Sequence, residues 1–203
     1  MNWLRVTGKE LEKLKLWLGV STLLFAVSLV FFMGATIMYQ EEIMMLFSVF
    51  LENLEEMAET VLEDSGPVEG TILLFANNFT ASLFTMLLGP VLIFTLGSLM
   101  LNGGLIGVVG AFYTFSGEFG FLAFLVGILP HGILEIPALL ISGAVGLKLG
   151  INLIAPPTGE SRWFALKNNY RIAFRLLPLV VLLLAVAAVI EIFITPPLLN
   201  LFE

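Results

Sequence analysis

The sequence predicts an all-α bundle that spans a membrane, and three observations support this class. Of the 203 residues, 59% are hydrophobic and only 12% are charged, and the mean hydropathy is +1.02. Soluble domains carry about twice that share of charge. Several uncharged runs are long enough to cross a hydrocarbon core about 30 Å thick, which takes roughly 20 helical residues. We therefore expect one polytopic membrane domain with five transmembrane helices, a re-entrant half-helix and an outer amphipathic helix.

The first three spans follow from uncharged runs and one pair of helix breakers. The first is expected over residues 16–38, because this run exceeds the 7–15-residue apolar core typical of a cleaved signal peptide. Residues 71–113 carry no charge over 43 positions, enough for two crossings. Gly89 and Pro90 divide this run, because Gly ends a helix easily and Pro starts the next one. The second and third spans are therefore expected over 71–89 and 91–113.

The apolar stretch over residues 117–150 is too long for one crossing. As a single helix it would extend about 50 Å at 1.5 Å per residue. Pro130 and Gly132 offer a break, and irregular backbone at membrane depth is tolerated where it is buried or lines a wet cavity. We expect this break to face the interior of the bundle. The predicted segments are a re-entrant segment over 119–129, a fourth span over 131–152 and a fifth span over 172–195.

The positive-inside rule gives the orientation. With the basic segment 1–15 in the cytoplasm, five crossings place the loop 153–171 inside and the tail 196–203 outside. All nine Lys and Arg residues then lie on the cytoplasmic side, and the first outer loop contains none. A sixth crossing at 119–129 would move the basic residues of the 153–171 loop outside, so five spans are favoured. We expect a multi-pass protein of the cell membrane with an extracytoplasmic C-terminus.

Residues 41–64 form an acidic segment with a regular apolar stripe. Its apolar residues recur at alternating spacings of four and three, which is the pattern of an amphipathic helix. Two interpretations stay open: the helix caps the bundle or the outer leaflet, or it pairs with a second copy or a partner protein. The residues of the stripe are Ile43, Phe47, Phe50, Leu54, Met57 and Val61.

Polar residues inside the predicted spans are the candidate site. His131, the chain's single histidine, and Glu135 share one helix face because they are four residues apart. Ionisable groups at membrane depth are costly and are functional candidates by default. Asn77, Asn78 and Asn102 occupy overlapping depths and can gather around them. Such groups can also simply join helices, at about 0.6–2 kcal/mol per bond. Structural bonding, a transport or proton path, and catalysis therefore remain as alternatives, in that order.

Small residues predict where the helices approach most closely. Gly103 and Gly107 in the third span, and Gly146 and Gly150 in the fourth, have the small-xxx-small spacing of tight helix contacts. The acidic helix is the segment that can pair with a second copy, and we expect a homo-oligomer embedded in the lipid bilayer, with possible membrane or extracytoplasmic protein partners. Nucleic acid is not expected as a partner, because the few basic residues do not cluster on one face.

The sequence offers little chemistry for an enzyme. It contains no HExxH, no GxSxG and no cysteine, so no catalytic residue and no cofactor is predicted. No metal site is expected either, because His131 and Glu135 supply two ligands where a catalytic zinc normally takes three. Glu191 is a weaker candidate, expected near the outer interface.

Two stretches resemble a known family. The run LPHGILEIPALLISGAVGLKLG at 129–150 closely resembles the signature of the stage II sporulation protein M family of integral membrane proteins. The asparagines at 77–78 and the run NGGLIGVVGAF at 102–112 are similar to its upstream region. The resemblance covers about residues 70–150, and its specific part is the HG-x-x-E-x-P-A stretch.

The resemblance implies a scaffolding role. Sporulating members of the family act in the mother-cell membrane during engulfment, where they hold peptidoglycan-degrading partners in a complex, and other members occur in organisms that form no spores. We therefore expect a non-enzymatic membrane scaffold that recruits or stabilises partner proteins. A channel or secondary transporter with a polar site around His131 and Glu135 is the alternative, and an intramembrane enzyme ranks third.

Overall fold

The computed structural model describes residues 3–61, 65–115 and 120–199, and within these ranges the chain is helical with no strand. Five helices, α2, α4, α5, α6 and α7, are long and apolar enough to cross a membrane. This confirms the predicted all-helical membrane protein with five spans. The helices are α1 (Trp3–Lys13), α2 (Lys15–Met38), α3 (Gln40–Glu59), α4 (Pro67–Leu87), α5 (Leu92–Phe115), α6 (Gly120–Ile154), α7 (Arg162–Phe193) and α8 (Thr195–Leu199).

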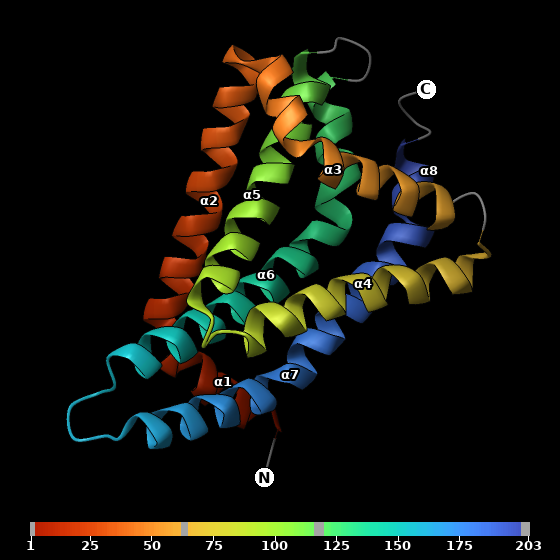
Figure 1. Ribbon diagram of the computed structural model, residues 1–203. Coiled ribbons are helices and arrows are strands. Elements are labelled where there is room, and N and C mark those ends of the chain that lie inside the picture. The colour runs from red at the N-terminus through yellow and green to blue at the C-terminus, as the bar shows by residue number, and fades with distance from the viewer. Residues whose placement is uncertain (1–2, 62–64, 116–119, 200–203) are drawn as a thin grey trace.

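The two ends of the bundle differ in charge (Figure 1). At the lower end in Figure 1 lie α1, the turn between α4 and α5, and the connection from α6 to α7. The nine Lys and Arg residues all belong to α1, to the start of α2, to the last part of α6 or to the first half of α7. We call this the basic end. The glutamate-rich α3 lies at the opposite end, which we call the acidic end.

Several predicted boundaries lie close to those of the structure. A turn over residues 88–91 separates α4 from α5, as the Gly89–Pro90 pair indicates. The segments expected as loop 153–171 and tail 196–203 are partly helical, because α7 already starts at Arg162 and α8 occupies Thr195–Leu199. Ser161 caps the start of α7, with its hydroxyl accepting a 3.2 Å hydrogen bond from the backbone N–H of Phe164. Parts of four predicted segments lie outside the described residues: 1–2, 62–64, 116–119 and 200–203.

The break predicted at Pro130 is not a break in the helix. In place of a separate segment before residue 130, the structure has one helix, α6, that continues through Pro130 and Pro137. Proline removes one backbone hydrogen bond and crowds the preceding turn, which bends a helix without necessarily ending it. Figure 1 shows the corresponding change of direction between the two halves of α6. The bend therefore fits about 52 Å of helix, at 1.5 Å per residue, into the bundle.

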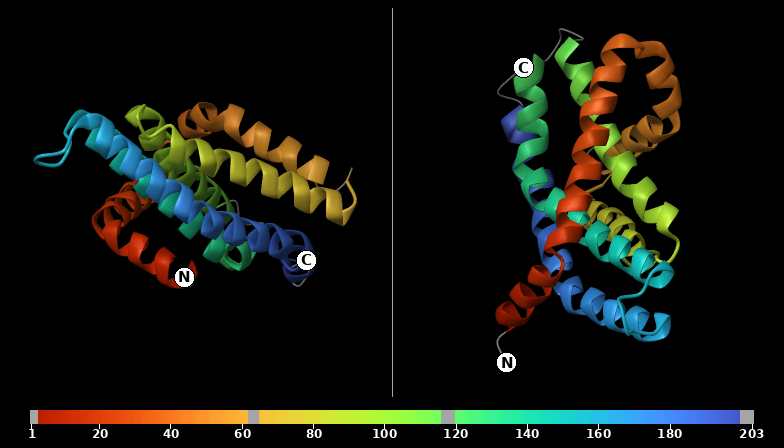
Figure 2. Two further views of the ribbon diagram at one scale, coloured as in Figure 1. Left: turned by 90° about the horizontal axis from the view of Figure 1, so that it is seen from below. Right: turned by 90° about the vertical axis from the view of Figure 1, so that its left-hand side faces the viewer.

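Among the described residues, buried apolar side chains form three clusters, and the two larger ones lie between the spans. One joins α4, α6 and α7 with Leu14, and includes the fully buried Met86, Leu149 and Leu176. The other joins α2, α5 and α6 around Phe25 and Leu99. Figures 1 and 2 show α4 and α7 running alongside each other, and the two helices are in contact. The outward side chains of α2, which include Leu23, Val27, Val30 and Phe31, are exposed as expected for lipid contact.

The predicted glycine pairs lie where helix backbones meet. A Cβ at Gly103 or Gly107 would overlap the carbonyl oxygens of Phe25 and Leu29, so this pair packs α5 directly onto α2. A Cβ at Gly146 would overlap the Thr85 carbonyl of α4, and one at Gly150 would overlap the Gly89 carbonyl in the following turn. Both pairs therefore permit the close approach that their spacing indicates.

Hydroxyl groups join the helices at the same levels. Ser21 donates to the carbonyl of Leu140 at 3.0 Å, and Ser28 donates to that of Met100 at 2.5 Å. Between α4 and α5, Thr95 donates to the carbonyl of Thr85 at 3.0 Å. Hydrogen bonds between helices are a main source of association in lipid, where apolar contact alone gives little preference for protein over acyl chains.

Candidate functional site

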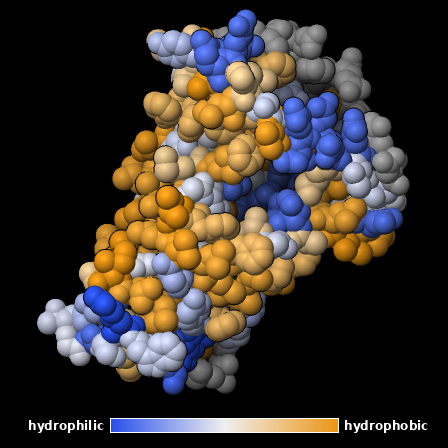
Figure 3. Space-filling view, viewed as in Figure 1, coloured by the Kyte–Doolittle hydropathy of each residue, from blue (hydrophilic) through white to orange (hydrophobic). Residues whose placement is uncertain are grey.

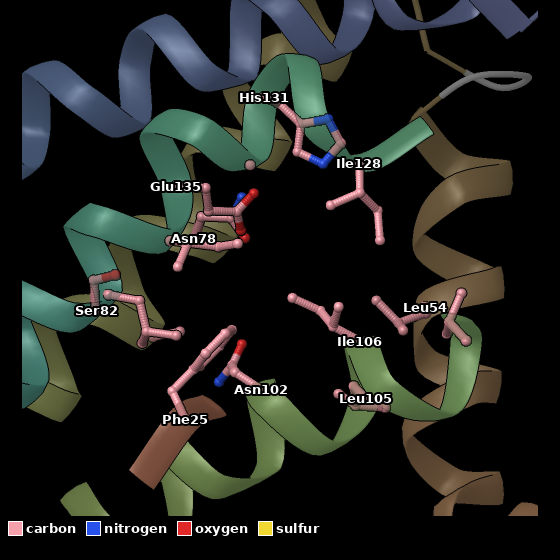
Figure 4. A pocket seen from close by; sticks show the side chains of 15 residues that line it. Phe25, Leu54, Asn78, Ser82, Asn102, Leu105, Ile106, Ile128, His131 and Glu135 are labelled. Atoms are coloured by element: carbon pink, nitrogen blue, oxygen red, sulfur yellow. The ribbon is translucent and has the colours of Figure 1, made fainter. Parts of the chain in front are cut away.

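A cavity of about 270 Å³ lies inside the bundle, toward the acidic end (Figure 4). Four of the polar residues predicted from the sequence line it, and they come from three different helices: α4, α5 and α6. We call this space the polar cavity. Its polar lining residues are Asn78, Ser82, Asn102, His131 and Glu135, and its apolar lining includes Phe25, Leu54, Leu105, Ile106 and Ile128.

Asn77 is the predicted site residue that does not line the polar cavity. It borders a separate hollow with residues of α3, among them Asn53 and Glu56. Its side-chain amide donates a 3.3 Å hydrogen bond to the side-chain oxygen of Asn78. Asn77 therefore orients a cavity residue from outside, because consecutive helix positions point in different directions.

The polar residues of the cavity do not form the hydrogen bonds that join the helices. Asn102 donates within its own helix, to the Ser98 carbonyl at 2.8 Å. The buried Nδ1 atom of His131 has no hydrogen-bond partner among the described residues. Between the membrane-spanning helices, the hydrogen bonds found among the described residues come from serine and threonine hydroxyls and from Tyr170, which donates to the Leu87 carbonyl at 3.0 Å. The arrangement thus leaves the cavity side chains available for something other than helix packing.

Glu191 joins the site from α7. One nitrogen of His131 and one carboxylate oxygen each of Glu135 and Glu191 all lie within 4.8 Å of one another, and all three residues are partly buried. From the sequence, Glu191 is the weaker candidate because it lies near the end of its span. Glu191 is an ionisable residue inside a span, and such residues are functional candidates. Its proximity to His131, however, depends on how α6 packs on α7.

The surroundings of this three-residue cluster are acidic. Among the residues that the structure describes, no Lys or Arg forms an ion pair with Glu135 or Glu191, and the ion pairs found all lie at the basic end. Figure 3 shows a hollow bordered by hydrophilic residues between α3 and α4. Since α3 carries Glu52, Glu55, Glu56 and Glu59, the approach to the cavity favours cations over anions.

The apolar stripe of the acidic helix divides into packed and open parts. Phe47 is buried against Phe32 of α2, with ring centroids 4.9 Å apart. Val61, just beyond α3, is buried with Leu74 of α4, and Met57 packs beside them. Ile43 is partly buried, whereas Phe50 and Leu54 stay exposed, Leu54 at the margin of the polar cavity. The stripe is thus held at both ends and spans the cavity in between.

One buried carboxylate lies at the basic end, outside the spans. Glu10 on α1 accepts hydrogen bonds from Arg175 at 2.5 Å and from Lys13 at 2.9 Å, and is only 2% exposed. Burial alone would raise the pKa of Glu10, but the hydrogen bonds and charges of Lys13 and Arg175 outweigh it and lower that pKa. This contact fastens α1 to α7.

Comparisons with known proteins agree with this architecture. A family model described as stage II sporulation protein M matches residues 21–196. An uncharacterized protein of Methanocaldococcus jannaschii is 30% identical over 109 residues, which are 54% of this chain and 46% of that relative, so the chain spans about half the relative's length. No solved structure matches the chain. Since the family model covers the polar cavity and nearly the whole bundle, this multi-pass membrane protein belongs to the stage II sporulation protein M family.

Proposed function

We propose that this protein is a non-enzymatic membrane scaffold that self-associates and holds partner proteins through α3. The supporting observation is the outer side of α3, away from the packed stripe. There Met45 and Val49 are 81% and 62% exposed, and Leu46 beside them is also exposed. Exposed apolar groups rimmed by charged residues are typical of protein or membrane contact sites. The partner that we assign to this side of α3 is a second copy of the chain, because most soluble oligomers are homo-oligomers.

The orientation forms part of this proposal. By the positive-inside rule, the basic end lies in the cytoplasm, and α3 and the C-terminus lie outside. The rule suits this chain well because α3 and its flanking residues 39–70 contain no Lys or Arg. In this orientation the scaffold presents α3 to extracytoplasmic partners, as the sporulating members of the family do when they hold peptidoglycan-degrading proteins.

Single cysteines on α3 test self-association, because the natural chain contains none. With Met45→Cys or Val49→Cys, we expect a thiol-specific bifunctional reagent to give dimers in reconstituted bilayers, since this exposed outer side of α3 pairs between copies. Glu55→Cys, which points roughly 100° away from these two positions around the same helix, is the matched control and should give at least about tenfold less dimer. Equal yields at all three positions would show that α3 lies on lipid and does not pair.

A second candidate, a cation- or proton-coupled carrier, is favoured by the polar cavity. Unpaired ionisable groups at membrane depth commonly mark ion or proton paths. The cavity holds Glu135 beside Asn78 and Asn102, and the acidic approach concentrates cations. In this candidate Glu135 carries the exchanged charge, whereas a scaffold requires only its shape.

Glu135→Gln separates the two candidates, because it keeps the shape and much of the hydrogen bonding but removes the charge. The carrier predicts dye-detected proton flux in vesicles under a potassium diffusion potential, reduced at least about tenfold by Glu135→Gln. Glu69→Gln, which changes an exposed carboxylate on α4, should leave any flux unchanged. A scaffold predicts no flux in the unmodified protein and unchanged cross-linking at Met45→Cys in the Glu135→Gln background.

A further inference from the structure

We propose that His131, Glu135 and Glu191 form a binding site for one divalent first-row transition-metal ion that bridges α6 and α7. The sequence supplies two of these ligands on one helix face, which is too few for a stable site. The packing of α7 on α6 brings in the third, so that one ligand atom of each residue lies within 4.8 Å of the other two. This inference does not depend on the scaffold proposed above; it shares Glu135 with the carrier candidate, and Glu191 is specific to the metal site.

The spacing suits a single ion. Ligand atoms bonded to one ion at about 2.0–2.2 Å lie roughly 2.8–4.4 Å apart, depending on the coordination geometry. The outer limit of 4.8 Å in the cluster is only slightly wider. Rotation of two glutamate side chains closes this difference without moving the helices, because their terminal torsions are broad.

Among the described residues, the three side chains have no other bonding partner that would compete with a cation. The Nδ1 atom of His131 is buried and unpartnered, and within the described ranges neither glutamate forms an ion pair. Two neighbouring carboxylates without a counter-charge repel each other strongly in a medium of low dielectric constant. A divalent cation neutralises both carboxylates and gives the imidazole a partner in one step.

The donor set indicates the class of metal. One imidazole and two carboxylates, with no thiolate in the chain, suit Zn²⁺, Mn²⁺ or Fe²⁺. Ca²⁺ prefers six to eight oxygen ligands, and Mg²⁺ is usually held by carboxylates and water. The polar cavity beside Glu135 has room for water molecules to complete the coordination, and Asn78 and Asn102 can hydrogen-bond them.

Equilibrium binding of Zn²⁺ and Mn²⁺ to the full chain in nanodiscs, after chelator treatment, tests the site. We expect one ion per chain, with a Kd raised at least about tenfold by Glu191→Gln and by Glu135→Gln, since each removes a ligand while keeping the volume. Glu69→Gln is the matched control and should bind as tightly as the unmodified protein, because this exposed carboxylate lies outside the cluster.

Co²⁺ provides a second readout that does not depend on affinity. Its visible absorption bands report nitrogen and oxygen ligation, so they should appear with the unmodified protein and shift or vanish in His131→Ala. Metal should also raise the unfolding midpoint of the unmodified protein but not of Glu191→Gln, because ligands stabilise the state that binds them. A chain that takes up no ion, or a Glu191→Gln variant that binds as tightly as the unmodified chain, would overturn the proposal.

Discussion

Gly107→Val is expected to lower the free energy of unfolding by about 3 kcal/mol or more, or to prevent folding. At this position a Cβ would overlap the carbonyl oxygen of Leu29 and lie 3.0 Å from the backbone nitrogen of Met33. Both atoms belong to the backbone of α2, so no side-chain rotation relieves the overlap. The two helices would have to separate, which would also lengthen the bond between Ser28 and the Met100 carbonyl.

Gly97→Val is the matched control for this expectation. Gly97 lies on the same helix, α5, but nothing lies within 4 Å of a Cβ placed there. The change in intrinsic helix preference from Gly to Val is the same at both positions, so the comparison isolates the contact with α2. Unfolding in mixed micelles of increasing denaturing-detergent fraction measures both variants. Equal midpoints for the two would show that α2 and α5 do not meet at Gly107.

Glu10→Ala is expected to release α1 from α7 and weaken its attachment by about 2 kcal/mol. The Glu10 carboxylate is buried between Arg175 and Lys13, and its loss leaves Arg175 without its partner. The effect stays below the 3–5 kcal/mol of a fully buried pair, because the Arg175 side chain is 44% exposed. Amide exchange in α1 should then be about 30-fold faster, at 1.4 kcal/mol per factor of ten.

Glu12→Ala provides the comparison at the same helix. Its carboxylate lies 3.9 Å from Lys15 and is 69% exposed, so we expect a change within about 0.5 kcal/mol. The Glu10 contact should also depend on pH. Since folding lowers the pKa of Glu10, the stabilisation is complete above its ordinary value of 4.5 and is lost as the pH falls through the lowered pKa. This account would be contradicted if acid accelerated amide exchange in α1 to the same extent in the Glu10→Ala and Glu12→Ala variants.

Hydropathy and helix breakers were sufficient to predict the spans. The break at Gly89 and Pro90 was clear because Gly and Pro occur together between two runs of membrane length. Pro130 misled the same reasoning, since its flanking residues are apolar enough to keep the helix intact around one lost backbone bond. A proline alone does not show whether a helix bends or ends, because the flanking residues determine which of the two occurs.

The candidate site could be predicted within a helix but not between helices. His131 and Glu135 share a face by their spacing, and Asn78 and Asn102 were placed at matching depths. Glu191 required knowing how α7 rotates against α6, which periodicity leaves open because α7 is apolar nearly all round. The same limitation explains Asn77, which lies one position from a cavity residue and yet faces a different hollow.

The bend in α6 separates its first ten residues, 120–129, from the rest of the helix, so this part can change its angle as a unit. Pro130 has no N–H to donate to the carbonyl of Val126, so the helix lacks one backbone hydrogen bond at this point. The segment of α6 before Pro130 is about 15 Å long, and α8 contacts α6. A tilt of about 10° would displace the tip by roughly 2.6 Å at that length. His131 directly follows Pro130, so a change in the bend angle would occur next to the imidazole.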